Sequence, residues 1–316
     1  MKILYFGTPD IAVPTLAALY AENAHDITVV TRIDKPRGRG LHIKPSPVKE
    51  FALSHGLKVL QPVSVKEESF VSATEKSKYD LIVVVSFGQI MPERLIKAAN
   101  YASINSHFSL LPKLRGAAPI NRAIMNGETE TGVTVQFIDY VLDSGDVMLS
   151  EAVDILPEDD AGRLGKRLSE LSAKLILEAV VLIEKGNAPR RPQEHSKATQ
   201  APKITKQDNR IDWEKPSEEI HNHIRGLSPL PGASACLGGH NIKILKSALP
   251  ADKIKLEPGR VGTVSGNGFP VGTGSGVLLL LELKPEGKRL MPAADFARGH
   301  KIENEVFDSL KKENGK

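Results

Sequence analysis

The run DLIVVVS, residues 80–86, decides the fold, because it is apolar almost throughout and rich in β-branched side chains. Strands of a parallel sheet that are covered on both faces have this continuous pattern. KILYF (residues 2–6) and DITVVT (26–31) are similar runs. The sequence therefore predicts a parallel sheet covered by helices in the first part of the chain.

Helical patterns separate these runs. We expect helices over residues 11–20, over PVKEFALSHG (47–56) and over PERLIKAAN (92–100). LKVLQP (57–62) and YASIN (101–105) have the pattern of further strands. Strands that alternate with helices form βαβ units, so the expected fold class is α/β with a Rossmann-like parallel sheet.

Three turns follow expected strands: GTPD (7–10), SFGQIMP (86–92) and NSHFSLLP (105–112). Ligands of such sheets bind beyond the carboxyl ends of the strands, so these turns should gather at one rim. GTPD could hold an anion at the start of a helix, but a plain strand-to-helix turn fits it equally well, because it has neither the G-x-G-x-x-G nor the P-loop pattern.

The second half of the chain changes character. TGVTVQFID (131–139) and DVMLSEAVDIL (146–156) read as paired strands, and a long helix is expected over 160–185. PSEEIHNHIRGL (216–227) reads as a short helix. The strand-like runs ACLGGHNIKIL (235–245), GRVGTVSGNGFPV (259–271) and GSGVLLLLELK (274–284) are split by glycine turns, which indicates a small, OB-like β-barrel. GTGSG (272–276) fits a hairpin turn better than a nucleotide loop, since a strand pattern follows it.

We therefore expect a catalytic domain at residues 1–189, a basic linker at 190–206 and a C-terminal β-barrel domain at 207–316. From Lys185 to Lys206 the chain carries six basic residues and one acid, Glu194. Such a segment is either a solvated linker or a contact for nucleic-acid phosphates.

Composition excludes several classes of protein. The 316 residues are 41% hydrophobic and carry a net charge of +4, without an apolar run of the roughly 20 residues that span a membrane. The single cysteine, Cys236, cannot form an internal disulfide, and MKILYFGTPD lacks the layout of a signal peptide. We expect a cytoplasmic monomer. Of nine histidines only His221 and His223 form a close pair, without an obvious third ligand, so no metal is expected. A G-x-S-x-G nucleophile motif is absent.

The candidate catalytic residues are Asn105, His107 and Asp143. The amide and the imidazole stand two apart at a predicted strand end, and the carboxylate lies in LDSGD (142–146). An amide and an imidazole can both donate to one developing oxyanion, and a nearby carboxylate can orient the imidazole and favour its charged form. This set suits acyl-type transfer without a covalent nucleophile. A structural or solvated histidine is the alternative.

NSHFSLLPKLRGAAPI together with LDSGD resembles the folate-dependent formyltransferase family. FGTPDIA, DKPRGRG, PSPVK and FGQIMP are similar to its first domain, and APKITKQDNRIDW, EEIHNHIRGLSPLPGA and PEGKRLM are similar to the second domain of the members that act on tRNA. The resemblance covers nearly the whole chain. It departs from the family at Phe108, where a small residue is usual, and at Leu230, where Trp is usual. These changes put in doubt the folate pocket and the packing of the second domain, respectively.

The resemblance implies an activity. The formyl group of 10-formyltetrahydrofolate, a substrate, moves to the α-amine of methionyl initiator tRNA, which is needed to start translation. Asn105 and protonated His107 would stabilise the oxyanion, and Asp143 would hold His107 charged. The residues implied to bind folate are Gly88, Gln89, Ile90, Met91, Ser109, Leu110, Leu111 and Pro112. Those expected to contact tRNA are Lys35, Arg37, Arg39, Arg190, Arg191, Lys203 and Lys206.

Three other functions stay open. A related formyltransferase could act on a small amine, such as a nucleotide sugar or glycinamide ribonucleotide. A hydrolase of formyl-folate could use water in place of the amine, although this leaves the second domain without a role. A catalytically silent RNA-binding module is the third, and it is disfavoured by the intact Asn105, His107 and Asp143.

Overall fold

The computed structural model describes residues 1–37, 42–251, 255–264 and 266–308, with the backbone alone at 35–37, 42 and 43. Contacts divide the chain into two units. Unit 1 comprises residues 1–119, 130–154 and 165–202, and unit 2 comprises 120–129, 155–164 and 203–316. Three separate stretches therefore build each unit. The domain bounds expected from the sequence stay a prediction.

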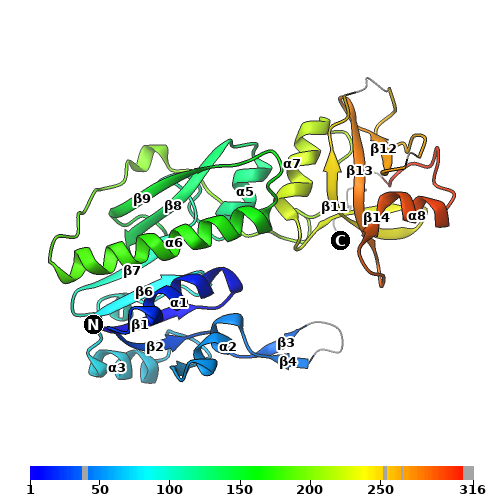
Figure 1. The fold of residues 1–316 in the computed structure, drawn as a ribbon. Coiled ribbons are helices and arrows are strands. Elements are labelled where there is room, and N and C mark those ends of the chain that lie inside the picture. Colours follow the sequence, from blue (N-terminus) through cyan, green and yellow to red (C-terminus); the bar gives the residue numbers. More distant parts are fainter. Residues whose placement is uncertain (38–41, 252–254, 265, 309–316) are drawn as a thin grey trace, which may run out of the picture. The chain divides into compact units, whose positions relative to one another are not determined.

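A seven-stranded sheet forms the centre of unit 1, with strand order β5-β2-β1-β6-β7-β8-β9 (Figure 1). Five strands are parallel: β5 (Lys58–Leu60), β2 (Asp26–Val30), β1 (Lys2–Gly7), β6 (Leu81–Val85) and β7 (Ala102–His107). β8 (Glu130–Phe137) and β9 (Val147–Asp154) then pair antiparallel at one edge. Leu81, Ile82 and Val83 are fully buried, as their continuous apolar pattern predicts. The α/β fold class is confirmed.

Helices accompany this sheet: α1 (Val13–Ala21), α2 (Pro47–Ser54), α3 (Glu68–Ser77), α4 (Glu93–Ile96) and α6 (Ala161–Glu184), which begins in unit 2. α1 and α6 lie along one face of the sheet (Figure 1). On that face Ser172 of α6 bonds Thr15 of α1 at 3.1 Å and Ser106 of β7 at 2.7 Å. Because neighbouring residues of a strand point to opposite faces, Asn105 and His107 belong to the other face.

Unit 2 contains an antiparallel sheet of order β10-β11-β13-β12, with β14 paired to β13. Its strands are β10 (Ala233–Leu237), β11 (His240–Ala248), β12 (Phe269–Gly272), β13 (Val277–Pro285) and β14 (Met291–Pro292). The β11–β13 register shifts near Lys246, and such irregularities increase the curl of a sheet. The expected OB-like curled sheet is confirmed, and GTGSG is the β12–β13 hairpin turn.

Helices α5 (Pro119–Met125), α7 (Ser217–Leu227) and α8 (Ala293–Gly299) complete the described elements, apart from two 3-10 turns and the short ribbon β3 (Lys35–Arg37) and β4 (His42–Lys44). Strand β3 of that ribbon carries Lys35 and Arg37, two of the residues expected to contact tRNA. Ile220 and Ile224 of α7 pack into a core with Leu278 and Leu280 of β13. Within the described residues, none of the helices combines the length and apolarity needed to cross a membrane.

Candidate active site

The carboxyl ends of β1, β6 and β7 carry the three turns that the sequence placed at one rim. These strands are neighbours and parallel, so the prediction is confirmed. The first two turns also touch, because Thr8 Oγ1 donates to the carbonyl of Phe87 at 3.5 Å. In the third turn Asn105 pairs with Gln136 of β8, and His107 pairs with Thr134. Four polar residues thus share one face at the rim.

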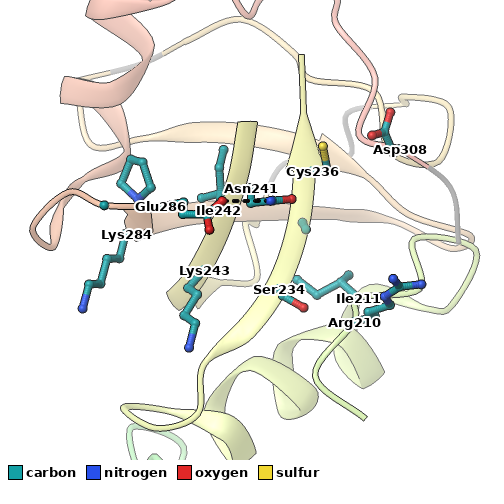
Figure 2. Close-up of a pocket in the computed structure, with 13 residues that line it drawn as sticks. Arg210, Ile211, Ser234, Cys236, Asn241, Ile242, Lys243, Lys284, Glu286 and Asp308 are labelled. Carbon is teal, nitrogen blue, oxygen red and sulfur yellow. Dashed lines mark hydrogen bonds between the residues drawn. The ribbon is translucent and has the colours of Figure 1, made fainter. Parts of the chain in front are cut away.

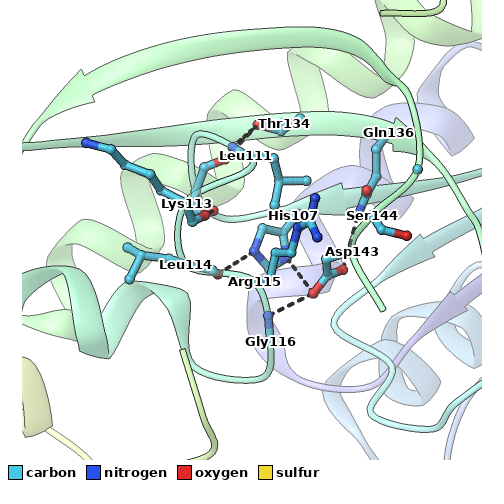
Figure 3. Close-up of polar contacts among 12 residues, drawn as sticks. His107, Leu111, Lys113, Leu114, Arg115, Gly116, Thr134, Gln136, Asp143 and Ser144 are labelled. Carbon is cyan, nitrogen blue, oxygen red and sulfur yellow. Dashed lines mark hydrogen bonds and ion pairs between the residues drawn. The ribbon is translucent and has the colours of Figure 1, made fainter. Parts of the chain in front are cut away.

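His107 lies between two acceptors (Figure 3). Its Nε2 is 2.9 Å from the carbonyl oxygen of Leu114, and its Nδ1 is 3.6 Å from Oδ2 of Asp143. The His107 and Asp143 side chains are buried. A carbonyl can only accept, so Nε2 carries a hydrogen. The charged ring, with a hydrogen on each nitrogen, can serve both contacts, whereas the neutral ring can donate to one of them.

Asp143 is fixed by two further donors. Its Oδ2 accepts from the backbone N–H of Gly116 at 2.9 Å, and its Oδ1 accepts from Nε2 of Gln136 at 3.1 Å. Asp143 and Leu114 both have left-handed backbone conformations, with φ of 52° and 57°. Residues other than glycine seldom adopt this region unless their surroundings hold them there, and such residues cluster at active sites.

Steric space explains why a glycine, Gly145, stands in LDSGD. A Cβ on Gly145 would lie 1.9 Å from the carbonyl oxygen of Phe137, closer than any real contact. Gly116 has the same constraint, since its Cβ would lie 2.7 Å from the carbonyl oxygen of Ala201 at a φ of 121°. Both glycines allow the chain to approach backbone closely on either side of Asp143.

Asn105, by contrast, has a half-buried side chain without a hydrogen-bond partner among the residues that the structure describes. Its amide is therefore available to a bound molecule. The structure thus brings His107 and Asp143 into contact and leaves the Asn105 amide unpaired on the same face of β7.

The turn after His107 is pinned to β8. Thr134 Oγ1 donates to the carbonyl of Ser109 at 2.7 Å and accepts from the N–H of Leu111 at 3.1 Å. The Ser109 hydroxyl donates to the carbonyl of Lys113 at 2.6 Å. Leu110, Leu111 and Pro112 remain half-buried at the surface of the turn.

The other predicted folate segment is more varied. Gly88 has a φ of 80°, and Gln89 Oε1 accepts from the N–H of Val65 at 3.1 Å. Ile90 is 65% exposed, whereas the Met91 side chain packs inside the core. The folate contacts of Gly88 to Met91 and of Ser109 to Pro112 stay predictions.

The residues expected to contact tRNA fall into several places. The Arg190 guanidinium stacks 3.6 Å from the Phe137 ring centroid and pairs with Asp146 at 3.6 Å, and Arg191 donates to the carbonyl of Met148. Lys203 and Lys206 are exposed in unit 2. The backbone of Lys35 and Arg37 belongs to β3, and Arg39 lies outside the described residues.

Of the two departures from the family pattern, Phe108 is buried and Leu230 is 77% exposed. The expectation that Leu230 alters packing in the second domain stays a prediction. An influence of Phe108 on the folate pocket stays a prediction.

The sequence pattern did not reveal Gln136 and Gln193, which both bond Asp143, or Arg115, which bonds Gln193. Gln136 could have been found, since strand alternation puts it on the same face as Thr134 within TGVTVQFID. Gln193 lies between two charged stretches without a local pattern around it.

A pocket of about 600 Å³ in unit 2 offers a different kind of surface (Figure 2). Arg210, Lys243 and Lys284 line it, with Cys236 and Asp308 at one end. A hydrogen bond with Asp308, and then burial, raise the pKa of the Cys236 thiol, so the thiol form dominates and this cysteine is a poor nucleophile.

The two close histidines serve the packing of unit 2. His221 Nδ1 is 2.9 Å from the Ser247 hydroxyl, and burial lowers the pKa of His221 to about 4. Across the part of the chain that the structure describes, groups of three or more His, Cys, Asp or Glu side chains suited to a metal are absent.

Comparisons with known proteins identify the family. The "Formyl transferase" family model matches residues 1–180, and "Formyl transferase, C-terminal domain" matches 203–301. The methionyl-tRNA formyltransferase of Syntrophus aciditrophicus is 43% identical over 302 residues, which are 96% of this chain and 97% of the relative. That of Bacillus velezensis is 42% identical, with 99% of each covered. This chain belongs to the methionyl-tRNA formyltransferase family.

Solved structures agree on the fold of this formyltransferase. HypX from Aquifex aeolicus in complex with tetrahydrofolic acid superposes with a TM-score of 0.67 at 20% identity, over 94% of this chain and 47% of HypX. WlaRD, a sugar 3N-formyl transferase, superposes with a TM-score of 0.67 at 22% identity, over 92% of this chain and 99% of WlaRD. At such low identities the similarity establishes the shared fold alone.

Proposed function

We propose that this formyltransferase moves the formyl group of 10-formyltetrahydrofolate to the free amino group of methionyl initiator tRNA. The product is N-formylmethionyl-tRNA, which serves translation initiation. The observation that carries the proposal is the 43% identity to a methionyl-tRNA formyltransferase over 96% of this chain, which includes both regions that match family models. We further propose that the enzyme acts as a monomer in the cytoplasm.

The reaction begins with attack by the amine. A free α-amine titrates at about 7.7–8.0, and its neutral form adds to the formyl carbon. A carbon–nitrogen bond forms, and the formyl oxygen takes the negative charge. The bond from that carbon to N10 of the folate then breaks. N10 keeps the electron pair of that bond and takes up the proton that the amine has lost.

Asn105 and His107 are the proposed donors to this oxyanion. The unpaired amide of Asn105 supports its role. His107 Nε2 donates to the neutral Leu114 carbonyl, which is a weaker acceptor than an oxyanion. We therefore expect Nε2 to exchange that carbonyl for the oxyanion, while Asp143 keeps its place beside Nδ1.

Asp143 has two proposed roles. Its carboxylate holds His107 in the charged form, and it helps to remove the amine proton through a water molecule. The donors from Gly116 and Gln136 support this, because they hold the two carboxylate oxygens while Oδ2 lies 3.6 Å from Nδ1 of His107.

The test is a formylation assay on purified protein with 10-formyltetrahydrofolate and methionine-charged initiator tRNA, in which formyl-methionine on the tRNA is quantified. Asn105→Ala, His107→Ala and Asp143→Asn should each lower kcat by about a hundredfold to a thousandfold, the usual cost of losing an oxyanion donor or its support. Asp139→Asn is the matched control, since Asp139 is exposed in the same β8–β9 connection.

Near-full turnover in His107→Ala or Asp143→Asn would refute the assigned roles. If the wild-type protein binds folate but does not formylate the tRNA, the acceptor is wrong, and small amines become the next substrates to assay.

A further inference from the structure

The segment from residue 190 to residue 202, which we call the strap, is the last stretch of unit 1. Val147 and Arg191 exchange two backbone hydrogen bonds of 2.8 and 3.0 Å. Further on, Arg115 donates its N–H to Thr199, and Ala201 donates to Arg115, at 2.9 and 2.7 Å. The strap thus pairs with the chain beside Asp143 and with the chain beside Leu114, the two segments that contact His107.

Gln193 sits between these two anchor points, with 7% of its surface exposed. Its Nε2 is 2.7 Å from the carbonyl oxygen of Gly145, 3.0 Å from that of Asp143 and 3.2 Å from Oε1 of Gln136. Its Oε1 accepts from Nη2 and Nε of Arg115 at 2.6 and 3.2 Å. One amide therefore joins both segments through its donor and its acceptor ends.

We propose that Gln193 is a positioning residue for the formyl transfer. Gln193 Nε2 donates to the backbone carbonyl of Asp143 and so holds the Asp143 backbone. Gln193 also fixes which way the Gln136 amide points. Because Gln136 Oε1 accepts from Gln193, Gln136 Nε2 faces the Asp143 carboxylate, to which it donates at 3.1 Å. Gln193 acts on His107 through Asp143 and does not touch the reacting atoms.

Neither matched family region includes Gln193, because they end at residue 180 and begin again at 203. The role of this residue follows from its contacts alone. The inference rests on the proposed function, since it assigns a part in that reaction.

Two substitutions of Gln193 distinguish the role of its donor end from the role of its acceptor end. Gln193→Glu keeps an acceptor for Arg115 but replaces the donor by an oxygen, which would face the carbonyls of Asp143 and Gly145. Gln193→Met keeps the length of the side chain, adds no charge and removes both kinds of contact. Gln200→Glu is the matched control, because it makes the same chemical change on an exposed residue of the strap.

We expect kcat to fall about tenfold to hundredfold in both Gln193 variants, because small misplacements of catalytic groups have effects of this size. The KM values for folate and tRNA should change less than about threefold, and the pH profile of kcat should change shape. Gln200→Glu should keep the wild-type kcat. Thermal unfolding of each variant checks that it is folded, and Gln193→Met carries the test if the buried charge of Gln193→Glu prevents folding.

A double-mutant comparison distinguishes positioning from a general structural role. In an Asp143→Asn background, single-turnover rates should fall less than about threefold on adding Gln193→Met, because there is no carboxylate left to position. Equal losses in both backgrounds, or wild-type kcat in the Gln193 variants, would overturn the inference. A wild-type protein that formylates no tRNA would instead contradict the proposed function.

Discussion

Leu114 and Asp143 show, at the scale of single residues, how the backbone sets the contacts of His107. Each residue has a left-handed conformation, and each supplies one acceptor to the imidazole. For residues with a Cβ this conformation costs about 1–2 kcal/mol. Two hydrogen bonds offset that cost: the Leu114 N–H donates to Thr199 Oγ1, and the Gly116 N–H donates to Asp143 Oδ2. The acceptors around the ring are thereby held in place before any substrate binds.

His221 gives a prediction for the stability of unit 2. Burial, and then the Arg225 guanidinium, lower its pKa from 6.5 to about 4. Between these values the unfolded chain binds a proton that the folded chain does not, so stability should fall as the pH drops from about 6.5 to about 4. His221→Gln keeps a hydrogen-bonding group near Ser247 and cannot titrate, so it should reduce this slope. Melting temperatures at about pH 7 and about pH 5 measure it.

Burial lowers the pKa of His223 as well, so some slope should remain in that variant. An unchanged slope in His221→Gln would contradict the prediction.

The sequence was informative about Asn105 and His107 because strand periodicity alone puts them on one face at a strand end. It could not locate Gln193, whose partners are the backbone carbonyls of Asp143 and Gly145 and two side chains far away in the sequence. Any residue has a carbonyl, so the composition around Gln193 holds no trace of these contacts. Only the folded path of the strap reveals them.

The β8–β9 connection is the element that carries Asp143, and Gly145 is its tightest point. Gly145→Ala would push a methyl group into the carbonyl of Phe137, which lies 1.9 Å from the ideal Cβ position. We expect a loss of about 1–3 kcal/mol in the free energy of unfolding, together with a fall in kcat as Asp143 moves. Chemical denaturation and the formylation assay measure the two effects.

Gly299→Ala is the control for this change, because a Cβ there meets nothing within 4 Å. It should be neutral or slightly stabilising at the end of α8. If Gly145→Ala were as stable and active as wild type, the connection would be freer to move than its contacts indicate.

Elements that bury a strong apolar pattern were predictable, and those without one were not. The strands β1, β2 and β6 and the long helix α6 follow the predicted runs closely. A clear apolar pattern does not mark α3, which buries Val71 and Thr74, or α8, whose seven residues are too few for a periodic signal. The run 259–271 has a strand-like pattern, and among its described residues before β12 the structure shows isolated bridges at Arg260 and Val261.

The two units of the molecule interleave along the chain, and this limits how they can be separated. Unit 2 takes residues 120–129 and 155–164 from within the first family region. Asn121 Nδ2, for example, donates to the carbonyl of Gly226 in α7 at 2.7 Å. Deleting everything beyond residue 206 would therefore strip partners from α5. Loss of tRNA formylation in such a deletion would not by itself assign tRNA binding to unit 2.

Point substitutions test tRNA binding more cleanly. If Lys203 and Lys206 contact phosphates, Lys203→Ala/Lys206→Ala should raise the KM for tRNA and leave the KM for folate unchanged. The slope of log KM against log salt should fall by about 1 for each lost contact. Steady-state kinetics over a range of salt concentrations measures this.

Lys97→Ala/Lys174→Ala removes the same amount of charge from lysines that pair with Glu93 and Glu151. It should leave the salt slope as in wild type. Equal effects of both double variants would mean that net charge, rather than contact at residues 203 and 206, governs tRNA binding.

The position of the strap late in the sequence also determines when the catalytic centre can form during synthesis. A chain under synthesis emerges from its N-terminus, and all seven strands of the large sheet are complete by residue 154. The loops around His107 gain their remaining partners only when Gln193, Thr199 and Ala201 have followed. A nascent chain can therefore have a complete sheet while its catalytic centre is still incomplete. The enzyme becomes able to catalyse the reaction only after its central sheet has formed.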